Sequence, residues 1–132
     1  MIRARIFALA VALWATLLVP SSDAGPPSQS PNDCVIVAVE MQRAVRSAAR
    51  LRKIDVWARV ICVRYAGQGM GHALTVFQPG NRICVYDADF GTAELKTTSH
   101  DPNVIARELG RHRAQAIVSG RFLEEGRASA RP

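Results

Sequence analysis

The sequence predicts an α+β fold, in which an N-terminal helix carrying a cysteine packs on a small antiparallel sheet. Apolar residues recur at three- and four-residue spacing between Cys34 and Arg52, as in a helix buried along one side. Short runs rich in β-branched and aromatic residues follow, separated by glycine- and proline-containing turns. A helix followed by consecutive strands of this kind is typical of one small α+β domain, which we expect at residues 33–123.

The first 24 of the 132 residues have the organisation of a secretory signal peptide. Arg3 and Arg5 form a basic start, residues 6–19 are almost entirely apolar, and Ala24 supplies a small residue for cleavage. An uncleaved membrane anchor is the alternative, but the apolar run is shorter than the ~20 residues that span a bilayer. We therefore expect a periplasmic or secreted protein, with a proline-rich linker at residues 25–32.

The predicted N-terminal helix begins at Cys34 and ends near Arg52. Asn32 and Asp33 are good N-cap residues, because their side chains accept hydrogen bonds from the first backbone N–H groups of a helix. The apolar stripe that we expect to face the sheet consists of Val37, Met41, Ala44, Val45, Ala48 and Leu51.

Three strands are predicted next, at residues 55–65, 73–77 and 82–86. A glycine-rich segment ending at Gly71 separates the first two strands. Pro79-Gly80-Asn81 is a turn sequence and makes the second and third strands an antiparallel hairpin.

A second helix and a further strand complete the predicted domain. Asp101 is a good N-cap, Pro102 fits the first helical position, and Gly110 is expected to stop the helix. Residues 114–122 are predicted as a strand, and residues 124–132 as a disordered polar tail.

The chain carries a net positive charge, which bears on the partners that it could bind. The chain has 17 Lys and Arg against 11 Asp and Glu, with a net charge of +6. The arginines are spread along the chain with few aromatic residues between them, which favours a solvated basic surface over specific nucleic-acid binding. We expect no membrane association once the signal peptide is cleaved, and the oligomeric state is left open.

Cysteines 34, 62 and 84 all lie after the predicted signal peptide. Exported proteins usually pair their cysteines, so Cys62 and Cys84 are a candidate disulfide that leaves Cys34 as the remaining thiol. The alternative is that Cys62 and Cys84 are two buried thiols.

Cys34 stands where a helix start stabilises a thiolate, because the helix dipole and unpaired backbone N–H groups favour negative charge. The alternative is a small buried residue. His72 opens the second strand, and Asp87 follows the third. If the hairpin loop has two residues (80–81) or four (79–82), Leu74 opposes Asp87, and His72 and Asp87 become diagonal neighbours on one face. A three-residue loop would turn Asp87 to the other face, and Asp89 with it. Asp89 is a rival partner for His72, with a turn role as its alternative.

This order of residues resembles the papain-like cysteine peptidase superfamily, and particularly its bacteriocin-processing and transglutaminase-like bacterial branches. The resemblance covers about residues 29–92: Cys34 at a helix head, Gly71-His72 opening a strand, and Tyr86-Asp87 closing the next. It implies that Cys34 is the nucleophile, His72 the general base and Asp87 the group that orients His72.

The same resemblance implies an oxyanion-hole amide upstream of the cysteine, for which Gln29 and Asn32 are the candidates. It implies a peptide or protein substrate and no cofactor, and no cysteine or histidine spacing indicates a metal site. Two other hypotheses stay open: a catalytically inactive exported binding module with the same fold, and a basic module that binds anionic polymers.

Overall fold

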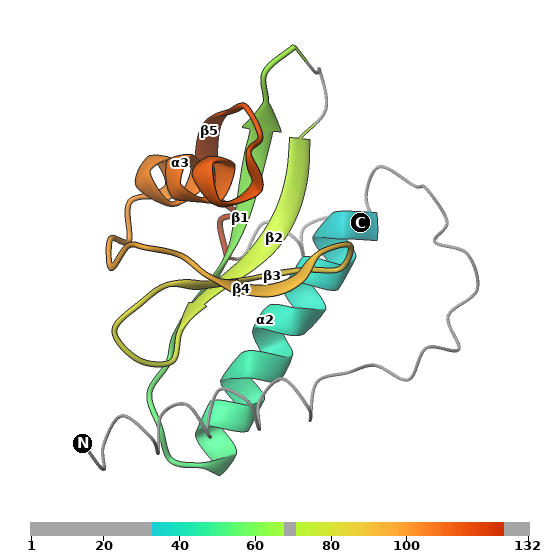
Figure 1. Cartoon of the computed structure of the whole chain (residues 1–132). Coiled ribbons are helices and arrows are strands. Elements are labelled where there is room, and N and C mark those ends of the chain that lie inside the picture. The colour runs from blue at the N-terminus through green and yellow to red at the C-terminus, as the bar shows by residue number, and fades with distance from the viewer. Residues whose placement is uncertain (1–32, 68–70, 126–132) are drawn as a thin grey trace. The chain divides into compact units, whose positions relative to one another are not determined.

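A five-stranded antiparallel sheet is the centre of the computed structural model, which describes residues 33–67 and 71–125 (Figure 1). The strand order is β4-β3-β2-β1-β5, so these described residues form an antiparallel sheet with two helices, which is an α+β fold, as predicted. In chain order, the elements are α2 (Asp33–Leu51), β1 (Trp57–Tyr65), β2 (Gly71–Gln78), β3 (Cys84–Asp87), β4 (Gly91–Glu94), α3 (Pro102–Arg113) and β5 (Ile117–Phe122).

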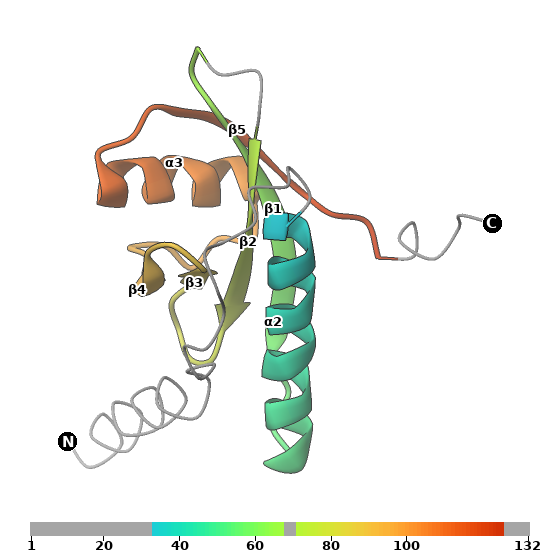
Figure 2. The same ribbon diagram turned by 90° about the vertical axis from the view of Figure 1, so that its right-hand side faces the viewer.

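The two helices lie on opposite faces of the sheet, which Figure 2 shows nearly edge-on between them. Side chains alternate between the faces along each strand, and residues paired across strands share a face. On β2, Leu74 and Val76 pack with the core on the α3 side, whereas Ala73 packs with α2. We call these the α3 face and the α2 face.

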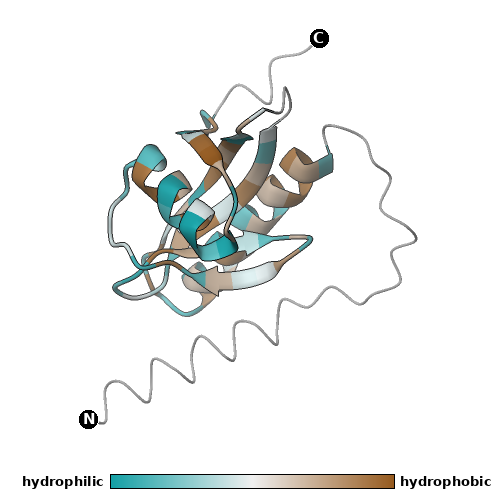
Figure 3. Ribbon diagram, turned by 45° about the horizontal axis from the view of Figure 1, so that its top comes forward, coloured by the Kyte–Doolittle hydropathy of each residue, from teal (hydrophilic) through white to brown (hydrophobic). Residues whose placement is uncertain are grey.

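The α3 face holds the larger hydrophobic core. α3 alternates hydrophobic and hydrophilic residues and turns Ile105, Ala106 and Leu109 inward (Figure 3). These three pack against large aliphatic residues of the sheet and its connections: Ile61, Val63, Leu74, Val76, Ile83, Val85 and Leu95. Burial of such side chains is worth about 1.5–3 kcal/mol each, so this face supplies most of the hydrophobic stabilisation.

The α2 face is built from smaller residues. Ala38, Val60 and Ala73 form its buried cluster, and the partly buried Cys34 and Cys62 pack against it. The hydroxyl of Thr75, on β2, donates a hydrogen bond to the carbonyl oxygen of Ala38 at 2.7 Å, which ties the helix to the strand.

Several boundaries differ from those predicted. β1 begins at Trp57 rather than at residue 55, and β4 was not predicted because its sequence, GTAE, has a single apolar residue. α3 continues through Gly110 to Arg113, so the prediction of a helix stop at Gly110 is wrong. A Cβ at Gly110 would lie 2.8 Å from the carbonyl oxygen of Gln115, so glycine is needed there for close approach of the chain that follows the helix.

The predicted signal peptide (1–24) and linker (25–32) lie outside the described residues. Within residues 33–67 and 71–125, neither helix combines the length and the apolar character needed to span a bilayer. At the other end, Glu125 accepts a hydrogen bond from Gln42 at 3.0 Å and pairs with Arg46 at 2.5 Å, so the start of the predicted tail contacts α2.

Candidate active site

His72 and Asp87 lie on the α3 face and contact each other. The β2–β3 register pairs Val76 with Val85 and Phe77 with Cys84, so an even number of residues separates the paired strands. Nε2 of His72 is 3.2 Å from Oδ1 of Asp87. The carboxylate of Asp87 is fully buried, and the imidazole is 19% exposed, so one end of the pair faces the protein interior and the other reaches the surface.

Arg113 is a third member of this group, and the sequence did not indicate it. It is the last residue of α3, and its guanidinium donates to Oδ2 of Asp87 at 2.7 Å while only 6% of its side chain is exposed. Ala114 then takes a left-handed conformation (φ 52°), and its N–H caps the helix. The basic last turn of α3 was readable in the sequence, but its contact with Asp87 depends on how α3 packs on the sheet.

The electrostatics of Asp87 fix the tautomer of His72. Burial by itself raises the pKa of Asp87, but hydrogen bonds from His72, from the backbone N–H of Asp89 and from Arg113 bring that pKa down to about 2. An ionised carboxylate only accepts hydrogen bonds, so Nε2 of His72 must carry a proton. In the neutral ring, Nδ1 is then left as the proton acceptor.

Gly71 allows β2 to lie close to β1 immediately before His72. A Cβ at residue 71 would lie 2.6 Å from the carbonyl oxygen of Val63, so any other residue would displace the start of the strand. The position of the imidazole therefore depends on this glycine.

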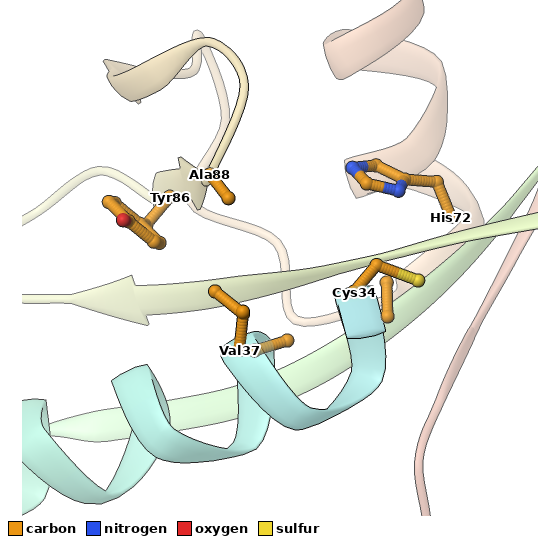
Figure 4. Close-up of a pocket in the computed structure, with 7 residues that line it drawn as sticks. Cys34, Val37, His72, Tyr86 and Ala88 are labelled. Atoms are coloured by element: carbon orange, nitrogen blue, oxygen red, sulfur yellow. The ribbon is translucent and has the colours of Figure 1, made fainter. Parts of the chain in front are cut away.

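Cys34 lies in the first turn of α2 and packs on the α2 face, beside Cys62 and Ala73. It nevertheless lines a pocket together with His72 (Figure 4). Five further residues from α2, β2 and the end of β3 complete the lining: Val37, Ala38, Ala73, Tyr86 and Ala88. The last β2–β3 pair in the register is Thr75 with Tyr86, so this pocket lies beside the part of β2 that extends past that pairing. Its volume of about 10 Å³ is room for roughly one water molecule.

The candidate Cys62–Cys84 disulfide is not formed, and this expectation is corrected. Cys62 pairs with Ala73 and Cys84 pairs with Phe77, so the two lie two strands apart and four residues apart along β2. These offsets are roughly 10 Å and 13 Å, well beyond the ~7 Å between Cα atoms that a disulfide tolerates. Burial raises the pKa of both thiols, to about 11 for Cys84.

The remaining predicted site residues are Gln29, Asn32 and Asp89. Gln29 and Asn32, the candidate oxyanion-hole residues, lie outside the described residues. Asp89 is exposed in the β3–β4 turn, and its backbone N–H donates to Asp87 at 2.9 Å. Asp89 thus stabilises Asp87 through its backbone N–H. Its place in the turn is the alternative role expected from the sequence.

His72, Asp87 and Asp89 could offer ligands to a metal ion, since one ligand atom from each lies within 4.8 Å of the others. The Arg113 cation, 2.7 Å from Asp87, opposes a second cation on that carboxylate. The hydrogen bonds from His72, Asp89 and Arg113 account for this cluster without a metal ion.

No protein-family model, curated protein or solved structure matches this chain.

Proposed function

We propose that this protein is an exported thiol hydrolase of the papain-like type, a peptidase or amidase that uses Cys34, His72 and Asp87. The hydrogen bond from His72 to a buried, ionised Asp87 carries the proposal, because it leaves Nδ1 as a base. Further support comes from the pocket that His72 lines together with Cys34. Export rests on the sequence of residues 1–24.

The proposed reaction has two stages. Nδ1 of His72 takes the proton of the Cys34 thiol, the sulfur attacks the substrate carbonyl, and a carbon–sulfur bond forms. Collapse of the tetrahedral intermediate breaks the bond to the leaving amine, which takes the proton from His72. Water then attacks the acyl-enzyme with His72 again as base, releasing the acid and restoring the thiol. Asp87 stabilises the imidazolium at each stage.

The first turn of α2 suits the nucleophile in this reaction. Unpaired N–H groups at a helix start favour the thiolate and can also stabilise an oxyanion. Cys34 belongs to the α2 face and His72 to the α3 face, so the two side chains would meet around the edge of β2, beyond its last pairing with β3.

Acylation by p-nitrophenyl acetate tests the proposal without a known substrate. We expect acetylation of Cys34, located by peptide mass spectrometry, and release of p-nitrophenol that falls by 10²–10⁴-fold in His72→Ala. Cys34→Ala should lose the acetyl group, and His112→Ala, an exposed histidine on α3, is the matched control. Acetylation spread over all three cysteines, or unchanged in His72→Ala, would contradict the proposal.

A catalytically inactive binding module with the same fold is the second candidate. The small pocket favours it, because about 10 Å³ does not hold an acyl group. A buried Asp–Arg pair also occurs as a structural feature without catalysis. This candidate predicts that Cys34→Ala keeps full binding to any partner and that no acyl-enzyme forms. Among active enzymes, the product formed with a primary amine present separates the two reactions: acyl transfer gives the N-acetylated amine, and hydrolysis gives acetate.

A further inference from the structure

We propose that Arg113 is a positioning residue that keeps His72 neutral while it holds Asp87 in place. Asp87 alone would favour a protonated His72, because a buried carboxylate stabilises an adjacent imidazolium. A histidine that is already protonated cannot act as a base. The Arg113 cation on the far oxygen of the same carboxylate opposes this effect.

The charges of the buried group make the direction clear. Asp87 and Arg113 together are neutral, so a protonated His72 leaves a net charge of +1 in a largely buried site. Without Arg113, a neutral His72 would leave −1 and a protonated His72 would leave zero. Burial disfavours net charge, so Arg113 shifts the equilibrium toward the neutral imidazole.

The contacts of Arg113 hold its guanidinium in this position. It lies 4.5 Å from the centroid of the Phe90 ring and donates to Asp87 at 2.7 Å. It also interacts with the hydroxyl of Tyr65. Backbone hydrogen bonds from Ala114 to Arg111 and from Gln115 to Gly110 close the helix immediately after it. The side chain therefore projects from a fixed helix end rather than from a loop.

The two oxygens of the Asp87 carboxylate accept hydrogen bonds from different partners. Oδ2 accepts from Arg113, and Oδ1 accepts from His72 and from the backbone N–H of Asp89. With Oδ2 engaged, the carboxylate cannot rotate away from the imidazole. The other titratable groups around the site are Asp89 in the β3–β4 turn, Tyr65 on β1 and Cys34 across the pocket.

The test follows the His72 imidazole by NMR as the pH is raised, with its signal assigned by its loss in His72→Ala. In Arg113→Met the midpoint of this titration should move upward by about one pH unit, because a nearby positive charge is lost. Arg113→Lys keeps the positive charge, so its His72 midpoint should stay close to that of the unmodified protein. Arg111→Met, which removes an arginine paired with Glu108 on the same helix, is the matched control and should leave the midpoint unchanged.

A measurement on the unmodified protein covers the case in which Arg113→Met does not fold. The side-chain N–H signals of Arg113 should shift with the midpoint of His72, whereas those of Arg111 should not. The proposal would be overturned by an unchanged midpoint in folded Arg113→Met or by an equal shift in Arg113→Lys. It would also be overturned if the Arg113 signals do not change with the His72 titration.

Only the catalytic consequence rests on the proposed function. If the protein is a thiol hydrolase, the acid limb of its pH–rate profile should move upward in Arg113→Met together with the His72 midpoint. A protein without hydrolase activity would refute the function and leave the titration result standing, so the two failures are distinguishable.

Discussion

The two faces of the sheet are built differently, and the proposed site uses both. The α3 face combines large aliphatic residues with a buried group of charges, Asp87, Arg113 and His72. The α2 face has small residues, a thiol at the helix start and one hydrogen bond from Thr75 to the helix backbone. The base is thus held by a buried group of charges, and the proposed nucleophile by a helix packed on small residues. Substitutions on the two faces should therefore have unequal effects.

The largest effect is expected for Asp87→Asn. This change leaves the buried guanidinium of Arg113 without its counter-charge, which typically costs about 3–5 kcal/mol of unfolding free energy. Urea denaturation measures this loss. Asp89→Asn in the exposed turn is the matched control and should stay within about 0.5 kcal/mol. Equal effects at the two positions would show that the buried Asp87–Arg113 pair does not set the stability of the α3 face.

The next effect is a loss of stability in acid. The pKa of Asp87 is about 2 when folded, against about 3.9 in an unfolded chain. A carboxyl group with a lowered pKa contributes stability that is fully present above the unfolded value and is lost as the pH falls toward the folded value. We expect the unfolding free energy to fall between about pH 4 and pH 2. Denaturation at stepped pH measures it, and Glu125→Gln, at an exposed ion pair, should keep most of this slope.

A smaller effect is expected where β2 meets α2. Thr75→Val keeps the shape of a fully buried side chain but removes the hydrogen bond to the Ala38 carbonyl, at a cost of about 1 kcal/mol. Thermal unfolding measures this cost. Hydrogen exchange in the first half of α2 should increase while that of α3 stays the same. An equal increase in both helices would show that the two helices do not unfold independently of each other.

The smallest effect on stability is expected for Cys34→Ala. Cys34 is partly buried in a cluster of small residues, so the change should cost no more than about 1 kcal/mol. Cys84→Ala, at a buried position on the same face, should cost more. Chemical denaturation of both variants makes the comparison. A larger loss for Cys34→Ala would point to a structural role for this thiol rather than the proposed chemical one.

Local patterns were enough to predict part of this structure. The periodicity of apolar residues predicted the bounds of α2 closely, because a helix with one buried side has a strong pattern. The buried face was predicted less well: it consists of Ala38, Gln42, Val45 and Ala49, and Leu51 of the predicted stripe is exposed. The parity of the hairpin loop related His72 to Asp87, because side chains alternate strictly along strands.

Features set by packing between distant segments were not predictable. Arg113 is 26 residues from Asp87, and the expected helix stop at Gly110 excluded it from the helix. The sequence also gave no indication that α2 would cover the face opposite to His72, because a helix–strand connection does not specify which face the helix covers. The missing Cys62–Cys84 bridge has the same origin, since the strand register decides it.

The alkylation rate of Cys34 decides whether His72 activates this thiol. With iodoacetamide near pH 7, we expect Cys34 to react about tenfold faster than Cys62 or a small thiol. The pKa of Cys62 is raised by burial, so it is a slow internal reference. His72→Ala should bring Cys34 down to the rate of an ordinary thiol, and His112→Ala should not. If Cys34 reacts at the ordinary rate in all three proteins, His72 does not activate it and the proposed catalytic pair is wrong.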